Sequence, residues 1–177
     1  MDVSTRMKKV STHIDNLYLW STKEPLYWRA AVDFGLELKA DGNVKAISLE
    51  LDRSLQGFLD DYYKRKKKIE SKMVPGFGYA INYGIMHRVP IYASDKHEKE
   101  FSMKIYELSS VTKEKIVDST DEEFRKIMNE WDEAFTSFEN TRAEGTAKNL
   151  EEIAKKTDGK VIHLCSENMA KKIIEII

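Results

Sequence analysis

The chain has 177 residues, 41% of them hydrophobic, and its 29 Lys and Arg nearly balance its 30 Asp and Glu, for a net charge of -1. This composition is typical of a globular protein with a buried core, and it excludes a globally basic nucleic-acid binder. The single cysteine, Cys165, excludes an internal disulfide and is typical of a reducing compartment. No apolar run is long enough to cross a membrane and no signal-peptide pattern is seen, so we expect a soluble, cytoplasmic protein.

The first third of the chain has the pattern of strands followed by a helix. Residues 14–22 predict a first strand, and residues 29–52 predict a β-hairpin because Asp41-Gly42 suits a tight type I′ turn. That turn sets a register in which the apolar side chains of both strands share one face. Helical spacing of the next apolar residues predicts a helix over 54–73.

The middle of the chain returns to a period of two. In residues 77–85, aromatic and aliphatic side chains alternate with small ones, which predicts a strand. Residues 89–93 predict an edge strand, because Pro90 cannot donate a hydrogen bond in a sheet, and such an edge offers a site for self-association. Residues 101–105 predict a further strand.

The last third of the chain is predicted to be mainly helical. A capping box that begins at Thr120 starts a helix over 121–139, and Gly145 is expected to break it before a second helical piece. A short apolar run at 161–165 predicts a buried strand, and a last helix over 166–177, capped by Ser166, follows.

These elements predict one α+β domain over residues 1–177, with 1–118 mainly sheet plus one helix and 119–177 mainly helical. Because strands and helices are segregated along the chain, we expect a largely antiparallel sheet of about six strands. Amphipathic helices at 54–73 and 121–139 are expected on one face of this sheet. A C-terminal helix–strand–helix unit would complete the core.

The predicted hairpin places acidic residues opposite its apolar face. Asp33 lies across from Glu50, Asp52 follows, and Lys39 lies on the same face. Like charges directly opposite destabilise a sheet, and hard cations such as Mg²⁺ or Mn²⁺ bind carboxylate oxygens. The pattern resembles the acidic motif of the PD-(D/E)xK nuclease superfamily. The resemblance implies Asp33, Glu50 and Asp52 as metal ligands and Lys39 as the residue that orients the attacking water. The alternative interpretation is a solvated strand face.

A run of cations on the predicted helix 54–73 is the second candidate site. Tyr63 and the tyrosine before it precede five consecutive basic residues: Lys64, Arg65, Lys66, Lys67 and Lys68. Such a helix can contact phosphates, and the tyrosines can stack on unpaired bases. The alternative is a solvated helix end, because Asp60 and Asp61 stand four residues before two of the cations and favour i,i+4 ion pairs.

Two further features have ordinary structural explanations. The aromatic side of residues 77–85 can line a pocket for a small apolar ligand, although a core strand explains the same pattern. The four histidines show no metal-ligand spacing, and His163 lies beside Cys165 in a run that reads as buried.

We therefore expect a non-enzymatic binding or assembly module without a cofactor, with a protein partner or self-association. In this hypothesis Tyr63 and the five cations contact nucleic acid. The alternative is a nuclease-like enzyme that uses Mg or Mn on the acidic face of the 29–52 hairpin.

Overall fold

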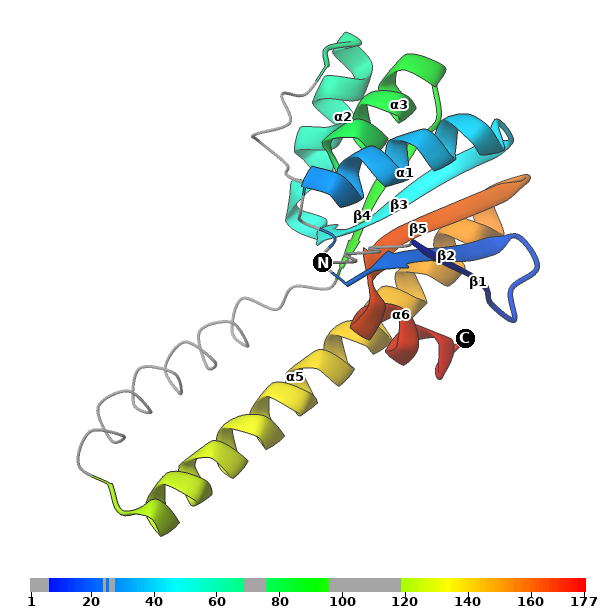
Figure 1. The fold of residues 1–177 in the computed structure, drawn as a ribbon. Helices are drawn as coiled ribbons and strands as arrows, with labels where there is room; N and C mark the ends of the chain where they lie inside the picture. Colours follow the sequence, from blue (N-terminus) through cyan, green and yellow to red (C-terminus); the bar gives the residue numbers. More distant parts are fainter. Residues whose placement is uncertain (1–6, 24, 26–27, 69–75, 96–118) are drawn as a thin grey trace.

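The computed structural model describes residues 7–23, 25, 28–68, 76–95 and 119–177 (Figure 1). In chain order the elements are β1 (Lys8–Ser11), β2 (Leu17–Thr22), α1 (Trp28–Asp41), β3 (Val44–Asp52), the 3₁₀ turn η1 (Arg53–Leu55), α2 (Gln56–Arg65), α3 (Gly78–His87), β4 (Ile91–Asp95), α5 (Asp121–Lys156), β5 (Lys160–Ser166) and α6 (Glu167–Ile174). The strand predicted at 101–105 lies outside the described residues.

The strands form one sheet in the order β1-β2-β5-β3-β4. The neighbours β2–β5, β5–β3 and β3–β4 are parallel, and the pair β1–β2 at one edge is antiparallel. Parallel neighbours need a connection that crosses back over the sheet, and helices supply it here. The combination of helices with a sheet confirms the broad α+β prediction, whereas the prediction of a largely antiparallel sheet is wrong.

Helices cover both faces of the sheet, rather than one face as predicted (Figure 1). Helices α1, α2 and α3 pack on one face, where Phe34, Phe77 and Leu59 are buried. Helix α6 and the C-terminal half of α5 pack on the other face, around Leu150 and Ile173. Because both faces are covered, the inner strands are apolar on both sides, which explains the continuous apolar run of β5.

The predicted hairpin over 29–52 is instead helix α1 followed by strand β3. Phe34 and Leu38, four residues apart, lie on the buried side of α1, whereas Leu36 is 61% exposed. The Asp-Gly signal ends this helix rather than closing a hairpin. Gly42 has φ +63°, and its N–H donates to the carbonyl of Leu38 at 3.3 Å. A glycine with positive φ suits both a hairpin turn and the end of a helix, so the Asp-Gly dipeptide alone does not distinguish a hairpin from a helix terminus.

Residues 77–85, predicted as a strand, form most of helix α3. Ile81 and Ile85 are buried four residues apart, which is helical spacing. Gly84 brings the helix close to β4, because a Cβ at this position would lie 2.6 Å from Cγ1 of Ile91. One of the small residues that suggested a strand, Gly84, is therefore the position at which the helix approaches β4.

In the C-terminal part of the chain, the helix caps predicted from residues close together in the sequence are confirmed. The Thr120 hydroxyl accepts a hydrogen bond from the N–H of Glu123, and the Glu123 carboxylate accepts one from the N–H of Thr120, so the capping box begins α5 as predicted. The Ser166 hydroxyl caps α6 by accepting from the N–H of Met169 at 3.3 Å. Strand β2 lies within the region predicted as a strand at 14–22, and β5 covers the predicted strand at 161–165 with one further residue at each end.

Two helix ends differ from the prediction. Gly145 does not break α5, because Ala143, Ala147 and Leu150 on either side of it are buried against the sheet. That packing outweighs the roughly 1 kcal/mol by which glycine disfavours a helix. Helix α2 ends earlier than predicted, at a left-handed Lys66. None of the helices among the described residues is long and apolar enough to span a membrane.

Candidate functional site

The four parallel strands all end at one edge of the sheet, the place where many open α/β sheets bind ligands. Polar side chains from β3, β4, β5 and α5 meet at this edge. We call them the carboxyl-edge network: Glu50, Asp95, Arg142 and Ser166. Asp95 and Ser166 are the last residues of their strands, and Arg142 reaches them from the middle of α5.

Arg142 is the centre of this network. Its Nε donates to Oδ1 of Asp95 at 3.2 Å, and its Nη2 donates to Oδ2 of the same carboxylate, so the pair is bidentate. Nη1 donates to Glu139 at 2.7 Å, and Nη2 also lies 3.2 Å from Oε1 of Glu50. The side chain is 18% exposed. Burial alone would lower the pKa of Arg142, but the bonds and charges of these carboxylates outweigh it and raise the pKa.

Glu50 joins β3 to the start of α6. Its Oε2 accepts the backbone N–H of Ser166 at 2.6 Å, and the Ser166 hydroxyl donates to Oε1 at 3.3 Å. Burial raises the pKa of Glu50, and the Ser166 N–H and the charge of Arg142 oppose this rise. A carboxyl group with a raised pKa at a strand end can accept and release a proton, which is the chemistry of a general acid or base.

A buried polar cluster continues from this network under α5. The hydroxyls of Ser48 and Ser94 are 2.7 Å apart, and Nδ1 of His163 lies 3.1 Å from the Ser48 hydroxyl. The Asn149 amide of α5 donates to the carbonyl of Ser94 at 2.8 Å. His163 is fully buried, and Nε2 has no hydrogen-bond partner among the described residues. Burial lowers the pKa of His163 to about 3, so its ring is neutral at physiological pH.

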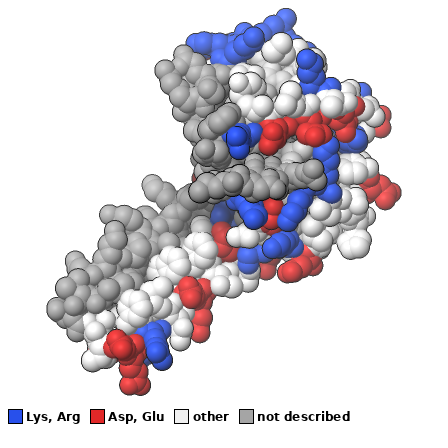
Figure 2. Space-filling view, viewed as in Figure 1, with Lys and Arg blue, Asp and Glu red and all other residues white. Residues whose placement is uncertain are grey.

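A second charged region lies where α2 and α3 end side by side. We call it the basic end, and it consists of Lys64, Arg65, Lys66, Lys67, Lys68 and Arg88. All six side chains are exposed, and Figure 2 shows basic atoms gathered over this part of the molecule. Within the described chain, Arg65 alone among them has an ion-pair partner, Asp61 at 2.8 Å. The other predicted i,i+4 pair is not formed, because Asp60 accepts from Gln56 instead.

Both helices at the basic end stop in an unusual backbone conformation. Lys66 and Arg88 follow the last turns of α2 and α3 with φ values of 55° and 61°. Among the described residues they are the two non-glycine residues with positive φ. Glycine is the usual residue at such positions, and a left-handed side-chain residue costs about 1 kcal/mol or more. Cations at helix C-termini recover part of this cost, because the helix dipole is negative there.

The tyrosines at the basic end hold its cations in place. The guanidinium of Arg88 lies 5.7 Å from the ring of Tyr63 and donates to the Tyr63 carbonyl at 3.3 Å. The ammonium of Lys67 lies 5.8 Å from the ring of Tyr62, which itself packs 4.6 Å from the ring of Phe58. These contacts fall within the range of cation–π interactions.

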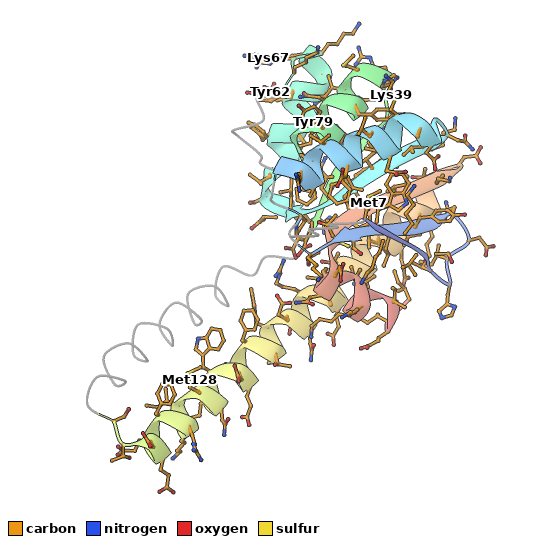
Figure 3. The ribbon with its side chains drawn as sticks, in the orientation of Figure 1. Met7, Lys39, Tyr62, Lys67, Tyr79 and Met128 are labelled. Atoms are coloured by element: carbon orange, nitrogen blue, oxygen red, sulfur yellow. The ribbon has the colours of Figure 1, made fainter. Side chains whose placement is uncertain are left out.

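The structure does not bring the predicted hairpin site together. Asp33 and Lys39 belong to α1, whereas Glu50 and Asp52 belong to β3, so Asp33 and Glu50 are not paired across two strands. Lys39 is exposed on α1 (Figure 3). Glu50 instead contacts Arg142 and Ser166. Asp52 caps the turn η1, since its carboxylate accepts from the N–H of Ser54 at 2.7 Å. Across the described ranges, no group of three or more His, Cys, Asp and Glu side chains is placed to hold a metal ion.

A cavity of about 280 Å³ lies beside the edge strand β4, between α2 and α5. Its lining includes Arg53, Gln56, Tyr92, Asn149 and Lys156. The Gln56 side chain donates to the carbonyl of Ile91 at 2.9 Å and accepts from the N–H of Ala93 at 2.7 Å. A glutamine amide thus pairs with the outer edge of β4 as a neighbouring strand would. The strand predicted at 89–93 is confirmed as an edge strand, although β4 begins two residues later and ends at Asp95, and this side chain occupies part of its edge.

The basic run and Glu50 were predicted as site residues from the sequence, whereas Arg88 and the other members of the carboxyl-edge network were not. Arg88 reaches Tyr63 from 25 residues away, and Arg142 reaches Asp95 and Glu50 from 47 and 92 residues away. The signal that could have found the network was a polar residue at the end of each apolar strand, which is informative once the strands are known to be parallel. Comparison of the chain with protein-family models, curated proteins and solved structures finds no match.

Proposed function

We propose that this protein is a non-enzymatic binding module that contacts nucleic acid through the basic end. The observation that carries the proposal is the density of exposed positive charge, since six cations are exposed and, among the residues that the structure describes, only Arg65 forms an ion pair, with Asp61. Phosphate contacts of this kind release counterions, which makes affinity high at low salt and insensitive to sequence. The net charge of -1 makes the contact local, because the rest of the surface does not attract a polyanion.

The backbone at the basic end supports the same proposal. Lys66 and Arg88 occupy positions at which glycine would stabilise the helix ends more. Strained residues of this kind cluster at functional sites, because their side chains are useful where the strain places them. We assign Tyr62 and Tyr63 a positioning role, since a cation or an aromatic ring already covers each of them.

Fluorescence anisotropy with labelled single-stranded and duplex oligonucleotides tests this proposal. Replacing Lys66, Lys67 and Lys68 with Ala is expected to weaken binding and to reduce the slope of log affinity against log salt by about two to three for a duplex. The matched control replaces three exposed lysines from other surfaces with Ala: Lys39, Lys148 and Lys171. Binding that ignores salt, or that falls equally in the control, would show that the basic end is not the contact.

The carboxyl edge supports a second candidate function, a divalent-metal-dependent, nuclease-like enzyme. The observation in its favour is that carboxylates lie in pairs at this edge, since Glu50 is two residues before Asp52 at the end of β3 and Asp52 is in register with Asp95 on β4. A thermal melt of chelator-treated protein with and without Mn²⁺ tests it. Metal at a hundredfold excess over its dissociation constant stabilises the folded state by about 2.7 kcal/mol. Stabilisation that Glu50→Gln abolishes would support this candidate, and no stabilisation of the unmodified protein would reject it.

A further inference from the structure

The N-terminal part of α5 projects from the body of the protein as an arm, which we define as residues 121–140 (Figure 1). The buried residues of α5 all lie between Ala143 and Ala154, so this part contributes none. At 1.5 Å per residue the arm is about 30 Å long. Its root is fixed, because Arg142 is bound to Asp95 and Glu50 at the sheet edge.

The arm is strongly acidic. It carries seven acidic and two basic residues, a net formal charge of -5. Six of the acidic side chains are exposed: Asp121, Glu122, Glu123, Glu130, Asp132 and Glu133. The seventh, Glu139, forms an ion pair with Arg142 at the root of the arm. Figure 2 shows acidic atoms on the arm and basic atoms at the far end of the molecule.

The arm and the basic end cannot meet within one copy. They lie at opposite ends of the protein, as Met128 on the arm and Lys67 at the basic end show in Figure 3. Helix α5 is continuous from residue 121 to residue 156 and its root is packed on the sheet, so the arm does not fold back. Any pairing of these two surfaces must therefore join different molecules.

We propose that copies of this chain associate head to tail, with the acidic arm of one copy on the basic end of the next. The two surfaces have opposite charges of similar size, both are exposed, and such complementarity favours encounter and sets orientation. Made once per pair of copies, such a contact produces rings or open chains, and made twice, each arm on the other copy's basic end, it closes a two-fold dimer. The proposal does not rest on nucleic-acid binding. Because both uses occupy the basic end, they exclude each other.

The test begins with sedimentation velocity of the full chain in the absence of nucleic acid. From about 0.01 M to about 1 M salt the screening length falls from about 30 Å to about 3 Å, which removes attraction between exposed charges. We expect species larger than the monomer at low salt and the monomer at high salt. An arm variant replaces Glu130, Asp132 and Glu133 with Lys and is expected to weaken association at low salt by about a hundredfold, because attractive pairs become repulsive.

The matching basic-end variant replaces Lys64, Lys66 and Lys67 with Glu, and it is expected to be monomeric as well. An equal mixture of the two variants is expected to associate again, because the reversed arm then meets a reversed basic end. This restoration also excludes misfolding of either variant. A wild-type chain that stays monomeric at low salt, a single variant that still associates, or a mixture that stays monomeric would each overturn the proposal. Failure of oligonucleotide binding would leave this result unchanged, so the two proposals fail separately.

Discussion

The basic end and the carboxyl-edge network are both centred on cations, but they are built in opposite ways. At the network, one guanidinium is shared among three carboxylates and is mostly buried. At the basic end six cations are exposed, and within the described ranges only Arg65 forms an ion pair, with Asp61. A buried charge without partners is strongly unfavourable, whereas an exposed one is hydrated and available to a ligand. The network therefore fixes α5 to the sheet at the root of the arm, whereas the basic end keeps its charge exposed to solvent.

The largest effect is expected when the network loses its cation. Arg142→Met leaves Asp95 and Glu50 poorly solvated and unpaired, and removing one partner of a buried pair costs about 4 kcal/mol. The free energy of unfolding from urea titration measures this loss.

The control for Arg142 is Lys148→Ala, an exposed change on the same helix that should stay within about 0.5 kcal/mol of the parent chain. If the two variants were equally stable, the network would not be what anchors the arm, and the contrast between the two regions would fail.

A somewhat smaller effect is expected from acid, through the buried cluster next to the network. Native His163 stays neutral down to pH about 3. In the unfolded chain a histidine binds a proton below about pH 6.5, so the unfolded state binds more protons and stability falls as pH falls. From pH 7 to pH 4 this group is expected to remove about 3 kcal/mol from the free energy of unfolding.

Glu50 acts in the opposite direction and reduces the net acid effect. Its pKa is raised in the folded state, so its contribution to stability is present at low pH and is lost as pH rises through the raised pKa. Denaturant titrations of the parent chain and of His163→Gln across this range isolate the histidine term. If the free energy of unfolding fell equally with pH in the parent chain and in His163→Gln, His163 would not be the source of the acid effect. The exposed His87→Gln serves as the control for the substitution itself.

The smallest expected effect is a change in stability at Lys66, and it tests whether the basic end is built for binding rather than for stability. Lys66→Gly relieves a left-handed backbone and is expected to stabilise the protein by about 1 kcal/mol while weakening oligonucleotide binding. Lys66→Ala is the matched control, since it removes the same charge but keeps a Cβ at positive φ. We expect equal losses of binding and a gain in stability for glycine alone, measured by anisotropy and by thermal melts. A glycine variant that binds as well as the parent chain would remove Lys66 from the interface.

Sequence patterns predicted the elements that neighbouring residues define, and they failed where a partner lies far along the chain. The capping box of Thr120 and the cap of α6 are local hydrogen bonds, and both were predicted correctly. Parallel pairing joins strands such as β2 and β5, whose partners Leu17 and Val161 are far apart in sequence. No local signal specifies such a pair, and the Asp-Gly dipeptide before β3 favoured the wrong hairpin instead.

The same distinction applies to the candidate sites, because only residues that are contiguous in the sequence could be predicted as a site. The five consecutive cations of the basic end were visible in the sequence because they are contiguous. Arg88 joins them through the contact of α2 with α3, which no local pattern encodes. Helix α3 itself was mistaken for a strand because Ala80 and Gly84 alternate with bulky residues in a way that satisfies a period of two as well as a helical face.

The Gln56 amide that pairs with β4 has a consequence for how the protein behaves at high concentration. An outer strand with unpaired backbone groups is a template on which other chains can add as further strands. One uncharged side chain occupies that template between Ile91 and Ala93, and at the opposite edge the short strand β1 carries two lysines, a feature that discourages strand addition. The Gln56 amide therefore protects this edge of the sheet, because it makes the hydrogen bonds that an added strand would make there. Losing that amide would affect solubility more than the fold of the individual molecule.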